Sequence, residues 1–476
     1  MSSVPFLAPL LTSGGDRRIH VARGSNVNVY GASPFPRAML AYASSTANDI
    51  SLGAFARLED FVSRLPAGAL QDAAHYCAEL ECVRLRLRRA FMLEDDVDIV
   101  FAPSGTDLEY VPLAMAVASS GKDVTNILLG PDEVGSGCAL ACGGRYFADE
   151  TAIISNARRG DSLAGFGEVE VTSLPIRDDE GRPCSSAETT TAIIQVCEQA
   201  IRQGRKILVH VVHGSKTGLA LPALADIDSL RGMFGAHLDL VVDACQARLE
   251  PATVRKYLQS GCTVLLTGSK FVGGPPFSGF ALVPGLARPT TPLPPGLATV
   301  FRRGEWPAQW RACDFLPASA NPGLLLRLLA AVFEIERFAC LSLADRDRVV
   351  VRFGEAVHGL KDRLGAALVG PSLGSGSLRL STLATLDLTP LPGNPNFATA
   401  QRWQRILAAR GIRLGQPVRC VRTADGDWGA TLRMSLSMPS IADLAALEEA
   451  ALASRLAHDM TCVAEVLEAA ARPVVA

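Results

Sequence analysis

The sequence has almost no net charge and no long apolar run. Its 46 lysines and arginines nearly balance its 48 aspartates and glutamates, which leaves a formal net charge of −2. The densest basic run, residues 84–89, is interrupted by leucines and is typical of a half-buried helix. Proteins that bind nucleic acids carry a basic patch or stripe, so we expect no nucleic-acid partner. No apolar stretch approaches the roughly 18 residues that span a membrane, so we expect no membrane partner either.

The sequence also lacks a cysteine framework, and we expect no secretory signal at its N-terminus. The 12 cysteines are scattered, and no positive residue precedes the short apolar part of the N-terminus. We therefore expect reduced thiols and a cytoplasmic protein. Cys138 and Cys142 lie four residues apart, and His210 and His213 lie three apart, but neither pair has two further ligands nearby in the sequence. The spacing therefore predicts no metal site.

The middle of the chain alternates short apolar runs with amphipathic segments. We expect strands at 97–101, 124–129, 207–212, 238–242 and 262–266, and helices at 108–118, 190–203 and 222–234. Continuous apolar strands separated by helices predict an α/β fold, with a mostly parallel sheet covered on both faces. Residues 149–187 are rich in Gly, Arg, Asp and Ser and are expected to form an irregular insertion or a hairpin.

The chain is long enough for more than one hydrophobic core, because 48% of its 476 residues are hydrophobic. Several prolines within 289–307 end the strand–helix alternation, and the sequence after residue 323 is strongly helical with a few short strands. We expect an N-terminal arm over 1–60, a large domain over 61–322, and a smaller α+β C-terminal domain over 323–476.

The strongest chemical signal is a set of polar residues at successive strand ends. The expected strand 238–242 ends in Asp243, and strand 262–266 is followed by Thr267-Gly-Ser-Lys270 and then by two glycines. Lysine is almost never buried without a partner, so its position at the end of a buried strand is unusual. Pro103-Ser-Gly-Thr106 lies between a strand and a helix, where free backbone N–H groups favour an anion. In parallel sheets, ligands bind at these carboxyl ends.

Pyridoxal 5′-phosphate (PLP) gives each of these features a role. An imine requires an amine, which Lys270 provides. The ring withdraws electrons only while its pyridine nitrogen is protonated, and Asp243 suits the carboxylate beside that nitrogen. Ser104, Gly105 and Thr106 would hold the phosphate. Each feature alone has a plainer explanation (an N-cap, a strand-end cap or a surface loop), but their order at successive strand ends favours PLP.

The pattern resembles fold-type I PLP enzymes, in the branch of class V aminotransferases and cysteine desulfurases. The desulfurase sequence Gly-Gly-Thr-Glu is similar to Ser104-Gly-Thr-Asp107, its Asp-x-x-Gln to Asp243 and Gln246, its lysine and Gly-Pro to Lys270 and Gly274-Pro275, and its late Arg-x-Ser to Arg433-Met-Ser435. The resemblance implies an aspartate-aminotransferase-like fold, an amino-acid substrate whose carboxylate binds Arg433, and a homodimer with active sites at the interface.

The resemblance also implies further cofactor contacts and shows two departures. The further contacts are Thr267 and Ser269, Ser215 and Thr217 at the ring edge, and Asn321 reaching the phosphate of the partner subunit. Val134 stands where the family has a histidine stacked on the ring, and Ser269 stands where desulfurases have a second histidine. His213, just past a strand end, is the candidate to replace the missing imidazole and to contact substrate.

The two missing histidines favour aminotransferase-like chemistry, because Lys270, once released by the substrate, can itself move a proton. The alternative is a cysteine desulfurase or a lyase that uses Cys420, since the segment from Gly411 to Cys420 is similar to the family's cysteine-bearing segment. Such a nucleophile must be an exposed thiol of low pKa. Decarboxylation and carbon–carbon bond formation stay open, as does a non-catalytic PLP-binding protein.

Overall fold

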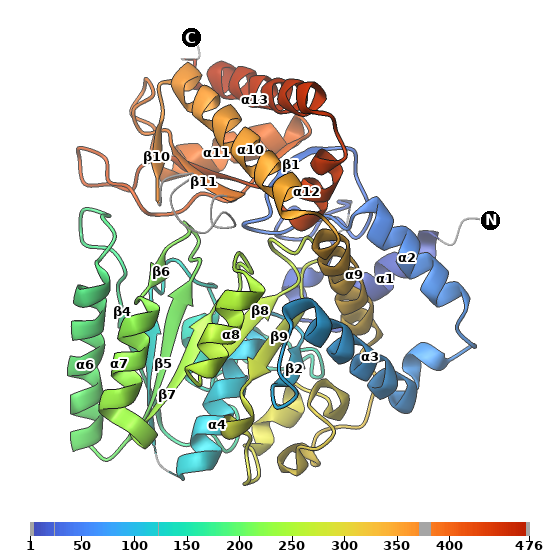
Figure 1. Ribbon diagram of the computed structural model, residues 1–476, viewed down its shortest axis with the longest axis vertical. Coiled ribbons are helices and arrows are strands. Elements are labelled where there is room, and N and C mark those ends of the chain that lie inside the picture. The colour runs from blue at the N-terminus through green and yellow to red at the C-terminus, as the bar shows by residue number, and fades with distance from the viewer. Residues whose placement is uncertain (1–3, 23, 122, 371–381, 473–476) are drawn as a thin grey trace.

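The computed structural model describes residues 4–22, 24–121, 123–370 and 382–472. Within these residues an eight-stranded sheet has the order β2-β9-β8-β7-β5-β3-β4, with β6 paired to β5 outside the series (Figure 1). Its strands are β2 (Asp98–Ala102), β3 (Val124–Leu129), β4 (Val169–Leu174), β5 (Lys206–His213), β6 (Ala220–Leu221), β7 (Leu238–Asp243), β8 (Thr263–Thr267) and β9 (Gly279–Val283). The strands β4, β3, β5, β7 and β8 are parallel. The predicted α/β fold with a mostly parallel sheet is confirmed.

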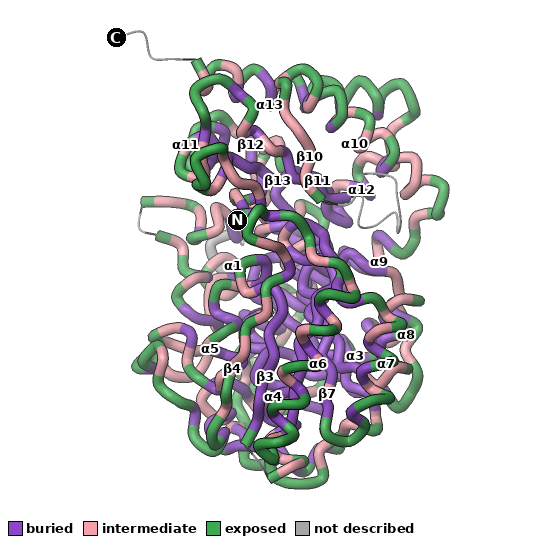
Figure 2. Tube along the Cα trace, turned by 90° about the vertical axis from the view of Figure 1, so that its left-hand side faces the viewer, coloured by how far each residue is buried: buried purple, intermediate pink, exposed green. Residues whose placement is uncertain are grey.

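The sheet is apolar on both faces, as the continuous apolar strands predict. Along β2, Ile99 and Phe101 pack into one core cluster and Val100 into another, and on β7 Val242 and Val241 divide in the same way. One face is covered by α4 (Tyr110–Ser120), and the other by α3 (Ala73–Phe91), α6 (Ser186–Arg202), α7 (Leu224–Phe234) and α8 (Pro251–Gln259). In Figure 2 the strands are the most deeply buried part of this region, and the outer helices carry the exposed residues.

Two strands differ from the sequence-based expectation. β9 was not expected; it runs antiparallel between β8 and β2. β4 lies inside 149–187, where we expected an irregular insertion or a hairpin, and it instead extends the sheet in parallel beside β3. As an edge strand it has no fully buried residue, so its sequence lacks the continuous apolar run by which the central strands are recognised.

The C-terminal part of the chain is a mixture of helices and a small antiparallel sheet. Its helices are α9 (Pro322–Ala339), α10 (Leu343–Leu364), α11 (Phe397–Ala409), α12 (Met438–Ala445) and α13 (Glu449–Ala471), and its sheet has the order β10 (Ala367–Val369), β11 (Leu383–Asp387), β13 (Thr431–Ser435). The N-terminal strand β1 (Leu40–Tyr42) pairs in parallel with β12 (Ile412–Leu414), while α1 (Val4–Leu11) and α2 (Leu52–Ser63) pack on α9. The N-terminal segment is therefore held by the C-terminal part. The expected division at residues 60 and 322 stays a prediction.

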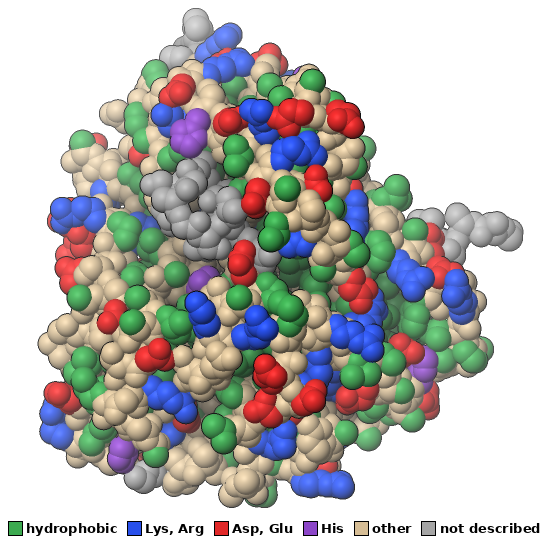
Figure 3. Space-filling model, viewed as in Figure 1, with side chains coloured by type: hydrophobic (Ala, Val, Ile, Leu, Met, Phe, Trp, Pro, Cys, Tyr) green, Lys and Arg blue, Asp and Glu red, His purple; other side chains and the backbone are tan. Residues whose placement is uncertain are grey.

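The surface shown in Figure 3 carries basic and acidic side chains interspersed with one another. None of the described helices is long and apolar enough to cross a membrane.

Candidate active site

A cavity of about 220 Å³ lies where the carboxyl ends of the parallel strands meet the N-terminal segment and the C-terminal part of the chain. The sequence-predicted residues that line it are Ser104, Gly105, Thr106, Val134, Ser215, Asp243, Gln246, Thr267, Ser269, Lys270 and Arg433. The fold thus brings together residues that are more than 300 positions apart in the sequence. Their places agree with the rule that ligands bind at the carboxyl ends of parallel strands.

Asp243 and Lys270 reach this cavity from neighbouring parallel strands. Asp243 is the last residue of β7, and Lys270 follows the end of β8 by three residues. One oxygen of Asp243, Oδ1, accepts a hydrogen bond from the backbone N–H of Cys245 at 2.9 Å. Burial raises the pKa of Asp243, the negative charge of Glu109 raises it further, and Lys270 opposes the shift. A cationic N–H beside Asp243 would therefore stabilise its ionised form.

The segment Ser104–Thr106 forms a tight cup between β2 and the helical turn η3 (Asp107–Glu109), which leads into α4. A Cβ atom on Gly105 would lie 2.8 Å from Cγ2 of Thr267, so only glycine fits without displacing that side chain. Ser104 Oγ donates to Asp107 Oδ2 at 2.6 Å. The pKa of Asp107 is raised to about 7, chiefly by burial and next by the charge of Asp16. A proton on Asp107 would remove its repulsion of an anion bound in the cup.

Arg18 is a cavity residue that the sequence interpretation missed. Its guanidinium is paired with Asp16, at 2.7 Å from Nη2 to Oδ2, and its Nη1 lies 3.4 Å from the Thr106 hydroxyl. It also lies 4.8 Å from the centre of the Phe147 ring and 5.3 Å from that of Phe277. The N-terminal segment thereby places a guanidinium beside the Ser104–Thr106 cup, with its charge balanced by Asp16. No local motif marks Arg18, because its place depends on how the N-terminal segment packs.

Arg433, on β13, is a buried cation held by neutral acceptors. Its Nε donates to the carbonyl of Gln416 at 2.8 Å, and its Nη1 donates to the carbonyls of Ser45 and Lys216 at 3.2 and 3.3 Å. Its Nη2 donates to the hydroxyl of Thr46 at 3.1 Å. Burial lowers the pKa of Arg433 to about 10, and within the described residues no carboxylate pairs with it. One N–H of Nη2 has no acceptor and is available to a ligand. A bidentate interaction with a carboxylate would therefore require Arg433 to break one of its existing hydrogen bonds.

Two further predicted residues differ in how free they are to contact a ligand. Gln246 donates Nε2 to the carbonyl of Ser45 at 3.2 Å, while its buried Oε1 has no partner. The hydroxyl of Ser215 donates to Glu133, a buried carboxylate that also forms an ion pair with Arg177. Gln246 therefore offers an open polar atom to the cavity, whereas Ser215 would have to leave Glu133 to bind a ligand.

The structure places His213 away from the cavity. Val212 and Gly214 line the cavity, and His213 does not; successive strand residues point to opposite faces, and His213 is the last residue of β5. Its Nδ1 lies 2.9 Å from the Tyr257 hydroxyl, and burial lowers its pKa to about 4. The predicted contact of His213 with substrate is therefore not supported. Val134, by contrast, lines the cavity, and its contact with a cofactor ring stays a prediction.

Neither Cys420 nor Asn321 is among the described residues that line the cavity. Cys420 is buried, and burial raises the pKa of its thiol to about 12, the opposite of the exposed thiol of low pKa that a nucleophile requires. Asn321 caps α9 by accepting from the N–H of Leu324, and its Nδ2 donates to the carbonyl of Gly14 at 3.0 Å. The amide of Asn321 is therefore occupied within its own chain.

Comparison with known proteins defines the class of the fold. No family model matches the chain, and no curated protein matches it in sequence. The structure nevertheless matches solved structures of the fold-type I, aspartate-aminotransferase-like class over most of its length. That predicted fold is confirmed, and sequence identities of this size show the fold alone.

The particular structures that it resembles are these. A NifS-like protein is 15% identical, with a TM-score of 0.57 over 90% of this chain and 99% of that one. The apo cysteine desulfurase from Thermococcus onnurineus NA1 is 17% identical, with a TM-score of 0.54 over 87% and 95%. The serine palmitoyltransferase from Sphingomonas wittichii is 13% identical, with a TM-score of 0.54 over 91% and 87%.

Proposed function

We propose that this chain is a PLP-dependent enzyme that acts on an amino-acid substrate, with the cofactor bound covalently through Lys270. The observation that carries the proposal is the placement of Lys270 and Asp243 at the ends of adjacent parallel strands, facing one cavity. When bound, PLP would supply an electron sink for bonds to the α carbon of an amino acid. One solved structure of similar fold is described as SPT (serine palmitoyltransferase) with PLP, so this fold is known to accommodate the cofactor.

The residues around the cavity fit this cofactor. Asp243, whose pKa burial raises, would hold a proton on the pyridine nitrogen. The unpartnered Oε1 of Gln246 leaves that side chain open to a polar group of the ring. The Ser104–Thr106 cup, where Gly105 admits no Cβ, would hold the phosphate, with Arg18 Nη1 as a further donor.

The substrate carboxylate would bind to Arg433, the buried cation whose partners in the described structure are carbonyls and a hydroxyl. Lys270, freed when substrate binds, would move the proton at the α carbon. Within the described structure no histidine lines the cavity, and its two cysteines, Cys138 and Cys245, have pKa values that burial raises well above the ordinary range. These features favour aminotransferase-like chemistry over desulfuration or another reaction in which a thiolate attacks.

The experiment that tests the cofactor is borohydride trapping followed by peptide mass spectrometry. Protein incubated with PLP should absorb in the visible, and reduction should fix PLP on Lys270. Lys216 is the matched control, because it is a second lysine that lines the same cavity. The Lys216→Ala variant should be labelled at Lys270, and Lys270→Ala should not be labelled. Label on Lys216, or none in the wild type, would refute the proposal.

The reaction type is tested with a panel of amino acids, read by both spectrum and products. Release of a keto acid, with conversion of the cofactor to its amine form, supports an aminotransferase. Sulfide released from cysteine would instead establish a desulfurase. A spectrum that stays unchanged with every amino acid would indicate a PLP-binding protein without catalysis. The homodimer that the resemblance implies would be measured by light scattering during gel filtration.

A further inference from the structure

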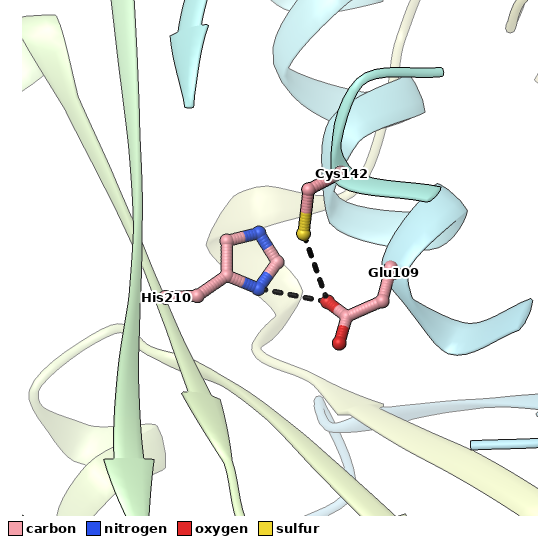
Figure 4. Close-up of side chains that lie close together, drawn as sticks. All are labelled: Glu109, Cys142 and His210. Atoms are coloured by element: carbon pink, nitrogen blue, oxygen red, sulfur yellow. Dashed lines mark hydrogen bonds and ion pairs between the residues drawn. The ribbon is translucent and has the colours of Figure 1, made fainter. Parts of the chain in front are cut away.

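Three side chains of metal-ligand type meet in the core next to the cavity. Glu109 comes from η3, Cys142 from the end of α5 (Cys138–Cys142) and His210 from β5 (Figure 4). Glu109 Oε2 lies 2.9 Å from His210 Nδ1 and 3.6 Å from Cys142 Sγ. One ligand atom from each residue lies within 4.8 Å of the other two, and none of the residues is more than 1% exposed. His210 is two residues before Val212, which lines the cavity, so both point to the same face of β5.

Several polar atoms in this cluster have no hydrogen-bond partner. Glu109 Oε1 and both ring nitrogens of His210 have no hydrogen-bond partner, and His210 Nδ1 is in ion-pair contact with Glu109 Oε2 at 2.9 Å. Asn126, on β3, donates Nδ2 to the carbonyl of Cys142 at 2.9 Å and leaves its own buried Oδ1 without a partner. Buried polar atoms are nearly always paired in native proteins. Two unpaired oxygens, the unpaired Nε2 of His210 and a neighbouring thiol therefore point to a ligand that satisfies them together.

We propose that Glu109, Cys142 and His210 bind a divalent transition-metal ion of the Zn²⁺ class. A carboxylate oxygen, an imidazole nitrogen and a thiolate sulfur are ligands that this borderline-soft ion accepts. Asn126 aligns with Leu208 in the register of β3 and β5, so its side chain lies on the same side of the sheet as that of His210. On binding, the thiol proton and any proton shared by the carboxylate and the imidazole pass to solvent, and no electrons are transferred. The two anionic ligands then balance the two positive charges, so no net charge is buried.

The proposed site contains one member of each closely spaced pair in the sequence: Cys142 of the two cysteines and His210 of the two histidines. Cys138, the other member of the cysteine pair, lines the cavity, and His213 contacts Tyr257. A bound ion would link η3, α5 and β5 to one another in the core beside the cavity. Its role is structural, and it is independent of whether PLP binds to Lys270.

The test is metal binding by the purified full chain after dialysis against a chelator. Titration with Co²⁺ should give one bound ion per chain and an absorption band from thiolate-to-cobalt charge transfer. Zn²⁺ should displace the Co²⁺ and raise the melting temperature. Cys142→Ala should abolish the band and weaken binding more than about 100-fold, since even the loss of a group that only supports a ligand costs about 10- to 100-fold.

Cys197→Ala is the matched control, because Cys197 is also fully buried but lies on α6, outside the cluster. It should bind Co²⁺ as the wild type does. If the Cys142→Ala chain does not fold, Cys142→Ser keeps the size of the side chain and must also lose the band. A wild-type chain that takes up no ion, or equal binding by the two alanine variants, would overturn the proposal and leave the cluster as a buried ion pair with a neighbouring thiol.

Discussion

The position of His213 makes a prediction that separates a structural role from a catalytic one. The ring is buried, with its Nδ1 beside the Tyr257 hydroxyl, and burial lowers its pKa to about 4. In the unfolded chain a histidine has a pKa of about 6.5. As the pH falls from 6.5 to 4, the unfolded chain therefore binds a proton that the folded chain does not, and stability falls. A pKa lowered from 6.5 to about 4 corresponds to a total loss of about 3 kcal/mol, of which about 2 kcal/mol is lost by pH 5.

The variant that tests this reasoning is His213→Asn. The asparagine amide can occupy the position of Nδ1 and keep a partner for Tyr257, but it does not titrate. Urea denaturation at pH 7 and pH 5 should show that the wild type loses about 2 kcal/mol relative to the variant. His358→Asn, at an exposed histidine on α10, is the control and should follow the wild type.

The same variant examines the sequence-based prediction that His213 binds substrate. Because the side chain lies on the face of β5 away from the cavity, KM for the best amino-acid substrate should change less than about 2-fold at pH 7.5, a loss of at most about 0.4 kcal/mol in binding. Identical pH dependence of stability in wild type and variant, together with a collapse of activity, would refute the structural explanation.

Three further predictions concern residues that line the cavity or lie close to it. Arg177→Met leaves Glu133 buried without its cation and should lower the free energy of unfolding by about 3–5 kcal/mol in urea; a loss below about 1 kcal/mol would contradict this. Iodoacetamide should label exposed Cys82 in the native protein and leave buried Cys420 unlabelled, as read by peptide mass spectrometry; modification of Cys420 before unfolding would restore it as a candidate nucleophile. Asp243→Ala removes the carboxylate proposed for the pyridine nitrogen and should lower turnover at least about 100-fold, equivalent to about 3 kcal/mol, while near-normal turnover would exclude Asp243 from the mechanism.

The sheet and its ligand-binding edge could be predicted because they depend on local patterns. Runs such as 124–129 and 238–242 consist mainly of Val, Ile and Leu, which suits a strand when both of its faces are covered. Parallel strands present their carboxyl ends at one edge, so Lys270 and Asp243 could be expected to meet there once their strands were recognised. The edge strand β4 has only half-buried and exposed residues, and for that reason it was not recognised.

What the tertiary structure alone decided is which side chains face the cavity and which lie behind it. His213 and Val212 are neighbours in the sequence, but the alternation of a strand sends only Val212 to the cavity. Arg18 reaches the cavity because the N-terminal segment packs there, which no local motif encodes. Glu109, Cys142 and His210 are separated by 33 and 68 positions in the sequence. Local patterning therefore determines the elements of this protein, whereas its buried charges and metal-type ligands meet only because the layers pack together.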